Sequence, residues 1–135
     1  MPVSQEQAYS AVDSAVQDAL SVGPDEVTPE TTIMGDLGAE SIDLLDILFR
    51  LERKLGIKIQ ASDLAAYVQG GIPDEEMGDE NGIVSAKGLA QLKKVMPQIN
   101  PDELAGTLQA NKAMSLFSVQ NLTDLVMQRA GAAAR

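Results

Sequence analysis

The chain has 135 residues, 44% of them hydrophobic, and contains two Tyr, two Phe and no Trp. This length suffices for one compact domain, and a core built from Ala, Val, Leu, Ile and Met favours packed helices over a β-sandwich. Because the chain contains neither Cys nor His, it excludes disulfides, thiol nucleophiles, imidazole bases and His/Cys metal sites within itself.

The formal net charge of −10 comes entirely from the first part of the chain. Residues 1–49 contain ten acidic residues and no Lys or Arg, whereas residues 50–135 contain ten acidic and ten basic residues. Such a field repels nucleic acid and anionic lipid and favours basic protein surfaces, although the same charge can simply keep a surface soluble. No signal-peptide pattern and no run of about 20 apolar residues is present, so we expect a cytoplasmic protein without membrane insertion or nucleic-acid binding.

The first predicted helix starts after Ser4, which forms a capping-box pattern with Gln7. Apolar residues then recur at helical spacing, and Gly23 followed by Pro24 is expected to end the helix. The segment 25–38 is predicted to be a long surface loop, of the kind that often carries function.

The second helix is predicted from about Ser41 to Leu55, with Gly56 as a left-handed stop. Its apolar residues form two stripes on different sides of the helix. The first stripe contains Leu44, Ile47, Leu48, Leu51 and Leu55, and the second contains Ile42, Leu45 and Phe49. The simplest interpretation is a helix buried nearly all round; the alternative is that one stripe faces the core and the other faces a partner.

The rest of the chain has further helix-start residues. Ser62 is expected to cap a short helix over residues 63–68 that Gly70 closes. Three more predicted helices run from Ser85 to Met96, from Asn100 to about Asn111, and from Ser118 to Gly131. The final five residues are expected to fray.

The acidic segment 72–82 invites comparison with a calcium-binding loop. If Gly82 is placed at the central glycine of an EF-hand, Met77 and Gly88 fall at the first and last ligand positions, and neither can bind calcium there. The segment is therefore predicted to be a solvated acidic loop, and no metal site is expected.

Ser41 opens the second helix and could be a nucleophile, a helix cap or a point of attachment. A serine nucleophile needs a base, and nothing suggests that Lys54 or Lys58, the nearest lysines in the sequence, reaches it. The surrounding sequence GAESI also lacks the second glycine of a nucleophile elbow. A cap is worth about 1 kcal/mol, whereas a helix N-terminus also favours an attached anion such as a phosphodiester.

Residues 36–43, with the sequence DLGAESID, resemble the D-L-G-[AI]-D-S-L-D signature of acyl carrier proteins. The order of a capped first helix, a long loop, a serine-led second helix and a late final helix also resembles that family. The resemblance implies an all-α helical bundle in which Ser41 carries 4′-phosphopantetheine, attached by a separate phosphopantetheinyl transferase. Asp36, Gly38 and Glu40 would surround this cofactor, with Glu40 replacing the commoner Asp.

The resemblance also implies a carrier with no catalytic residues of its own, acting as a monomer. Its partners would be the transferase and acyl-chain synthases and acyltransferases with basic surfaces. The residues expected to meet these partners are Ile42, Leu45 and Phe49, with Asp43 and Asp46 steering the basic surfaces.

Two features depart from the common family pattern. Arg50, Arg53 and Lys54 bring bases into the end of the second helix, which resembles specialised long-chain carriers of lipid A assembly. Residues 60–116 exceed the family's usual connection, so we expect one domain over residues 1–135 with a helical insert there. The expected function is to carry acyl chains for fatty acid or lipid biosynthesis; the alternatives are a carrier of aminoacyl or polyketide intermediates, and an unmodified helical adaptor.

Overall fold

The computed structural model describes residues 4–133, which contain helices and isolated β-bridges but no strand. This confirms the all-α prediction. In chain order the elements are α1 (Gln5–Leu20), the 3₁₀ turn η1 (Pro24–Glu26), α2 (Ser41–Leu55), α3 (Ala61–Gln69), α4 (Asp74–Met77), α5 (Ala86–Val95), α6 (Pro101–Leu104), the 3₁₀ segment η2 (Ala110–Leu116) and α7 (Val119–Ala133).

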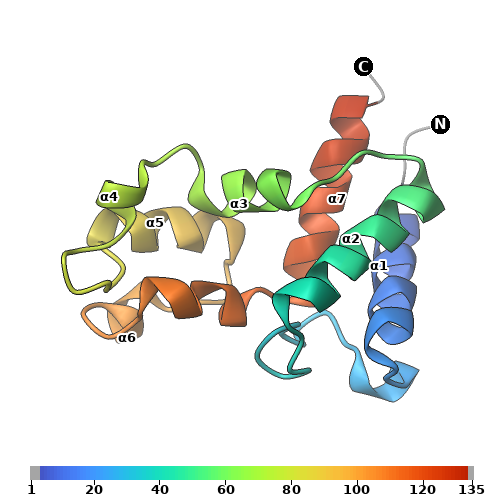
Figure 1. The fold of residues 1–135 in the computed structure, drawn as a ribbon, viewed down its shortest axis with the longest axis horizontal. Coiled ribbons are helices and arrows are strands. Elements are labelled where there is room, and N and C mark those ends of the chain that lie inside the picture. The colour runs from blue at the N-terminus through green and yellow to red at the C-terminus, as the bar shows by residue number, and fades with distance from the viewer. Residues whose placement is uncertain (1–3, 134–135) are drawn as a thin grey trace.

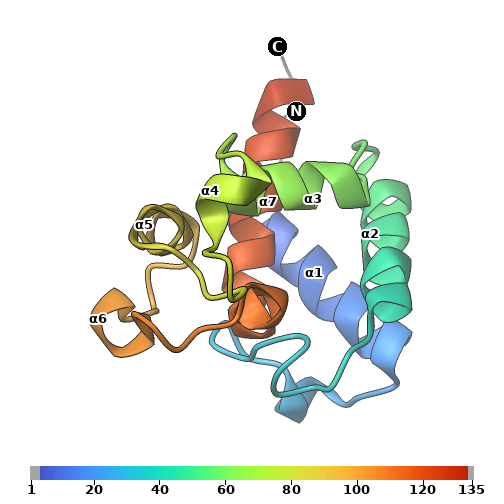
Figure 2. The same ribbon diagram turned by 60° about the vertical axis from the view of Figure 1, so that its left-hand side comes forward.

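The helices form two parts that lie side by side (Figure 1). In the first, α1 packs against both α2 and α7, and we call these three the bundle. In the second, α5 packs against α3, α4 and α6; we call α3–α6 together with η2 the second lobe. Figure 2 shows α3 reaching from the end of α2 towards α4 and α5, so this helix spans the two parts.

The bundle core consists of aliphatic side chains, as the composition predicts. Its centre contains residues with an exposed fraction of 0%: Val12, Val16, Ile47, Leu51, Leu122 and Val126.

Helix α2 is buried on one side only. Ile47, Leu48 and Leu51 are buried, whereas the side chains of Ile42 and Phe49 are 70% and 58% exposed. The interpretation of a helix buried nearly all round is therefore wrong, because the bundle covers only the face that α1 contacts.

Of the two predicted ends of α1, one is confirmed and one differs from the structure. The capping box at Ser4 is confirmed: its N–H donates to Gln7 Oε1 (2.9 Å) and its Oγ accepts from the Gln7 N–H (3.1 Å). However, α1 ends at Leu20. The next residue, Ser21, is its C-cap and is left-handed (φ 56°), and the Val22 N–H donates back to Gln17 O. This Schellman-type turn closes the helix before Gly23 is reached.

Helix α3 begins earlier than predicted. Gln60 precedes its first residue, and the Gln60 N–H donates to Asp63 Oδ2 (2.9 Å), so Ser62 lies inside the helix and is not its cap. Gly70 closes the helix in the left-handed conformation (φ 63°), as expected.

The second lobe and the last helix bring three further corrections. The acidic loop contains the short helix α4, and the helix that starts after Asn100 ends already at Leu104. Gly106 turns the chain (φ 75°) so that Leu108 O can accept from the Val84 N–H (2.8 Å), and this tertiary pairing replaces further helix. Helix α7 continues past Gly131 to Ala133; the last two residues of the predicted fraying tail lie outside the described residues.

Candidate functional site

Ser41 is the first residue of α2 and its side chain is exposed. Glu40, the residue before the helix, occupies its N-cap position, and the Glu40 N–H donates to Asp43 Oδ2 (2.8 Å). None of the hydrogen bonds among the described residues uses the Ser41 hydroxyl. The interpretation of Ser41 as a helix cap is therefore wrong. Its hydroxyl lies at the positive end of a 15-residue helix and makes no hydrogen bond to another described residue.

The loop before Ser41 is held by local and long-range contacts. The Thr32 N–H donates to Asp36 Oδ2 (3.0 Å) and the Asp36 N–H donates to Thr32 Oγ1 (2.8 Å). Ile33, which is 1% exposed, anchors the loop in the core, and Gly38 turns it with a φ of 69°. Of the predicted site residues, Asp36 and Gly38 thus shape the backbone that presents Ser41.

The second stripe of α2 leads away from Ser41 along the helix surface. Ile42, Leu45 and Phe49 are all more than half exposed, and the guanidinium of Arg53 lies 5.9 Å from the centre of the Phe49 ring. The structure therefore brings these predicted residues together on one open apolar face. The predicted steering residue Asp46 pairs with Arg50 (3.1 Å), but both are partly exposed, so this ion pair contributes little stability.

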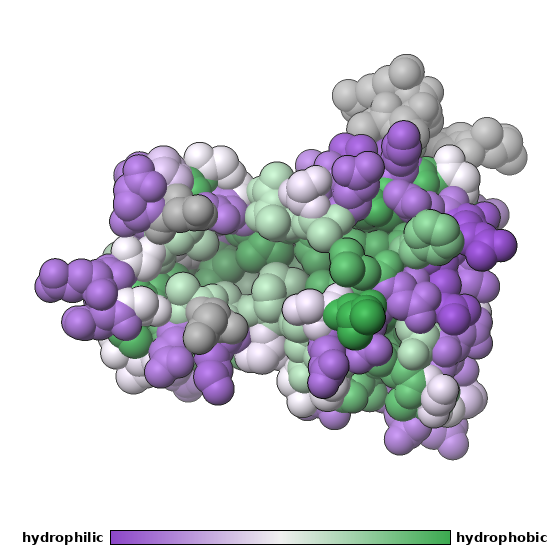
Figure 3. All heavy atoms as spheres, viewed as in Figure 1, coloured by the Kyte–Doolittle hydropathy of each residue, from purple (hydrophilic) through white to green (hydrophobic). Residues whose placement is uncertain are grey.

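A large groove of about 970 Å³ begins beside Ser41 and runs between the bundle and the second lobe. Figure 3 shows its apolar floor as a green band between two polar rims. The apolar side chains along it come from α2 (Leu44, Leu45), α3 (Ala61, Leu64, Ala65, Val68), η2 (Ala110, Ala113, Met114), and Met34, Met77 and Leu92. Polar side chains also line it, namely Gln69, Glu75, Asp79 and Glu80.

The walls that α3 and η2 contribute to this groove were not predicted as site residues. One signal was available in the sequence, because Ala61 and Ala65, and likewise Ala110 and Ala113, place small side chains one helical turn apart. Small residues on neighbouring turns leave room between packed segments, but the sequence does not say which segments face each other.

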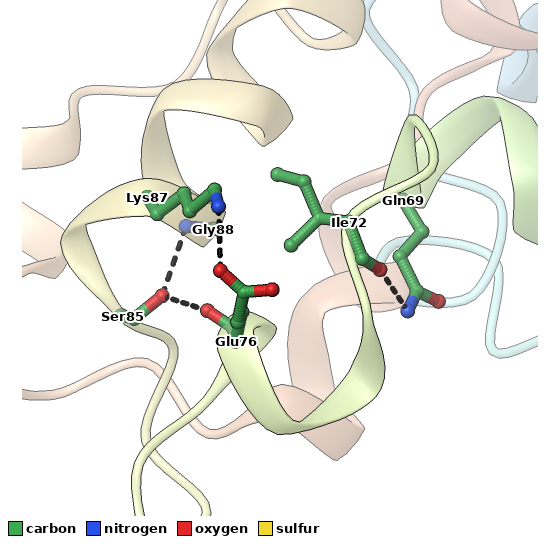
Figure 4. Close-up of polar contacts among 6 residues, drawn as sticks. All are labelled: Gln69, Ile72, Glu76, Ser85, Lys87 and Gly88. Atoms are coloured by element: carbon green, nitrogen blue, oxygen red, sulfur yellow. Dashed lines mark hydrogen bonds and ion pairs between the residues drawn. The ribbon is translucent and has the colours of Figure 1, made fainter.

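The wall formed by α4 is fastened to α5, as Figure 4 shows. Lys87 Nζ lies 2.6 Å from Glu76 Oε1, and Ser85 Oγ donates to Glu76 O (2.6 Å) while accepting from the Gly88 N–H (3.0 Å). The Gln69 amide donates to Ile72 O (2.7 Å) in the turn before α4. Ser85 thus caps α5, as predicted, and also binds α4 to it through the hydrogen bond to Glu76 O.

One titratable group near the groove has a shifted pKa. Burial raises the pKa of the Tyr67 phenol above its usual value, and the negative charge of Asp124 adds to the effect. The phenol is therefore neutral at physiological pH.

Comparisons with known proteins bear on residues 10–68, which match the family model described as "Phosphopantetheine attachment site". The chain is 38% identical over 61 residues to "Acyl carrier protein" of Thermotoga maritima; these residues make up 45% of this chain and 75% of that protein. It is 34% identical over 65 residues to "Meromycolate extension acyl carrier protein" of Mycobacterium bovis, covering 48% of this chain and 56% of that protein.

A third relative, "Acyl carrier protein" of Clostridium perfringens, is 34% identical over 59 residues, covering 44% of this chain and 78% of the relative. No solved structure matches the chain. Within residues 4–133, no helix has the length and apolar character needed to cross a membrane.

Proposed function

Because this chain belongs to the acyl carrier protein family, we propose that Ser41 carries the family's 4′-phosphopantetheine and that the protein holds acyl chains on it as thioesters. The observation that carries the proposal is the exposed hydroxyl of Ser41. This residue begins a helix inside the matched region, and its hydroxyl makes no hydrogen bond within the described residues. A phosphodiester at this place would be favoured by the helix dipole and the backbone N–H groups.

The composition is consistent with this role. The proteins of this family carry chains and do not themselves catalyse reactions. The chain contains no Cys, and the prosthetic group supplies the thiol. Attachment would form an ester between Ser41 Oγ and the phosphate of the arm, with coenzyme A as donor and adenosine 3′,5′-bisphosphate as leaving group. Asp36, Gly38 and Glu40 would hold the backbone around this ester.

We further propose that partner enzymes dock on the open face of α2. Ile42, Leu45 and Phe49 offer apolar contacts, and Asp43 and Asp46 offer negative charge to basic surfaces on a phosphopantetheinyl transferase, on acyl-chain synthases and on acyltransferases. The absence of Lys and Arg from residues 1–49 supports this direction of steering.

The cargo is proposed to be a long apolar chain used in fatty acid or lipid biosynthesis. The apolar walls of the groove beside Ser41 favour such a chain over an aminoacyl group. A lipid A pathway has only the basic residues Arg50, Arg53 and Lys54 in its favour, whereas the name of one relative refers to meromycolate extension. We also propose that residues 60–116 are an insert within a single domain. The family match, residues 10–68, includes nearly all of α3, so the part of this segment that lacks a match begins at residue 69.

Intact mass after co-expression with a broad-specificity phosphopantetheinyl transferase tests the attachment. The wild type should gain the mass of one phosphopantetheinyl group and Ser41→Ala should gain none. Because the hydroxyl makes no hydrogen bond to any residue that the structure describes, Ser41→Ala should change the free energy of unfolding by no more than about 0.5 kcal/mol.

Ser62→Ala, at another exposed helical serine, is the matched control and should be modified like the wild type. Modification that persists in Ser41→Ala would place the arm elsewhere. A wild type that stays unmodified with several transferases would favour the unmodified adaptor.

A further inference from the structure

We infer that the open face of α2 carries opposite charges at its two ends, and that the partner it fits presents acidic groups to its C-terminal half and basic groups only near Ser41. This inference rests on the docking of partners on α2 proposed above, and it specifies the charge pattern of the surface that docks there. Helix α2 lies at the outer edge of the molecule, away from α5 and α6, where a partner can reach this face (Figure 2).

The charge changes sign within α2 itself. No Lys or Arg precedes Arg50 in the chain. Asp43 and Asp46 lie in the first half of the helix, whereas Arg50, Arg53 and Lys54 follow in its last turns. Asp43 and Arg53 are ten positions apart, which corresponds to about 15 Å along a helix. Because exposed charges act over about 8 Å at physiological ionic strength, a partner meets the two ends as separate charges.

Arg53 belongs to the open apolar face. It follows Phe49 by four positions, and its exposed side chain places the guanidinium 5.9 Å from the centre of the Phe49 ring. A base that only complemented the negative end of the helix could lie on any side of the last turn. The position over the aromatic ring instead holds the positive charge of Arg53 at the end of the stripe formed by Ile42, Leu45 and Phe49.

The positive charge at this end is not neutralised within the described part of the chain. Arg50 pairs with Asp46 at 3.1 Å, and both side chains are partly exposed. Among the described residues, neither Arg53 nor Lys54 forms an ion pair with a carboxylate. Two cations at the end of the apolar stripe are therefore free to pair with acidic groups of a partner.

This charge pattern selects among partners. A uniformly basic surface is attracted near Ser41 but meets like charge at Arg53, and like charges brought together in an interface reject the wrong partner. A surface with bases opposite Asp43 and acids opposite Arg53 is attracted at both ends. The pattern also fixes the direction in which the partner lies along α2, because the reversed direction would place base against base.

Two synthetic helical peptides serve as probes of the charge pattern. Each is about 18 residues long, above the length of roughly 12–15 residues below which isolated helices are marginal, and both have the same stripe of Leu. The mixed peptide carries Lys in one half and Glu in the other, and the all-Lys peptide carries Lys in both halves. Titration at low salt gives the Kd of each peptide for the phosphopantetheinylated protein. The amide chemical shifts of Ile42, Leu45 and Phe49 verify that binding occurs on α2.

Arg53→Glu should act in opposite directions on the two peptides. The Kd of the mixed peptide should rise roughly fivefold, whereas the Kd of the all-Lys peptide should fall about twofold or more. Arg53→Gln removes the charge without reversing it and should move each Kd in the same direction by less, so it repeats the test if Arg53→Glu folds poorly.

Lys94→Glu is the matched control. Lys94 is exposed on α5, and its replacement changes the net charge of the protein by the same amount. Because Lys94 lies on the second lobe, this variant should leave both Kd values nearly unchanged.

A shift of both Kd values in the same direction in Arg53→Glu would overturn the inference. Equal effects of Arg53→Glu and Lys94→Glu would also overturn it, because only the total charge would then matter. If neither peptide shifts the amides of α2, the docking surface proposed above fails and this inference fails with it. Failure of the attachment is recognised separately, since the intact mass would then show no arm.

Discussion

Gly88 lies in the first turn of α5, where the chain leaving α4 passes unusually close. A Cβ at this position would lie 2.5 Å from Met77 O and 2.9 Å from Val84 Cγ1. Because Met77 O belongs to the backbone, the contact cannot be relieved by turning a side chain. The absence of a side chain at Gly88 thus sets how closely α4, one wall of the groove, approaches α5.

We expect Gly88→Ala to destabilise the protein. Replacing a helical Gly by Ala gains about 1 kcal/mol of helix propensity, but the clash with Met77 O should cost more, so the net loss should be about 1–2 kcal/mol. Urea unfolding measures the loss.

Gly23→Ala is the control, because Gly23 has a φ of −85° and a Cβ added there would meet nothing within 4 Å. It should be neutral or slightly stabilising. A Gly88→Ala protein as stable as the wild type would mean that α4 shifts freely away from α5.

Among the elements, α5 and α7 are joined by one buried amide. Asn121, which is 1% exposed, accepts at Oδ1 from the Ser118 N–H (2.8 Å) and from Gln98 Nε2 (2.7 Å). Its Nδ2 donates to Val95 O (3.1 Å) at the end of α5. This side chain therefore fastens the second lobe to the bundle.

We expect Asn121→Ala to cost about 2–4 kcal/mol, because it leaves buried backbone groups of Ser118 and Val95 without partners. Gln98→Ala is the matched comparison and should cost about 1 kcal/mol, since Gln98 is exposed and water can replace it. Urea unfolding gives both values. If the two variants lose the same stability, Asn121 does not act through these backbone partners.

At the scale of the whole molecule, the uneven distribution of charge along the chain acts over the longest distance. The first 49 residues carry the entire net charge of −10 and include α1 and most of α2. Exposed charges act over about 8 Å at physiological ionic strength, so this field should accelerate the approach of a basic partner mainly at low salt.

We therefore expect modification by a phosphopantetheinyl transferase to slow as salt rises. At low salt Asp43→Asn should reduce the second-order rate roughly twofold or more, while its amide oxygen still accepts from the Glu40 N–H. Asp102→Asn removes the same charge from the second lobe and should have a smaller effect. Equal rates for the two variants at all salt concentrations would show that charge near Ser41 does not guide the transferase.

Features that depend on neighbours along the chain could be predicted without coordinates. The caps at Ser4 and Ser85 are confirmed, and so are the left-handed stops at Gly56 and Gly70. Each of these contacts joins residues within about four positions, so local sequence is sufficient to specify it. The family signature around Ser41 is equally local.

Features that join distant residues emerged only from the tertiary structure. The groove brings together Ser41, Ala65 and Met114, and the link between the lobes depends on Asn121 and Val95. The same cause explains one wrong helix end, because the pairing of Val84 with Leu108 ends the helix after Asn100 early. Side-chain spacing identifies an apolar face but not what covers it. In α2 the bundle covers the face with Ile47, Leu48 and Leu51, whereas the second stripe lies at the open surface.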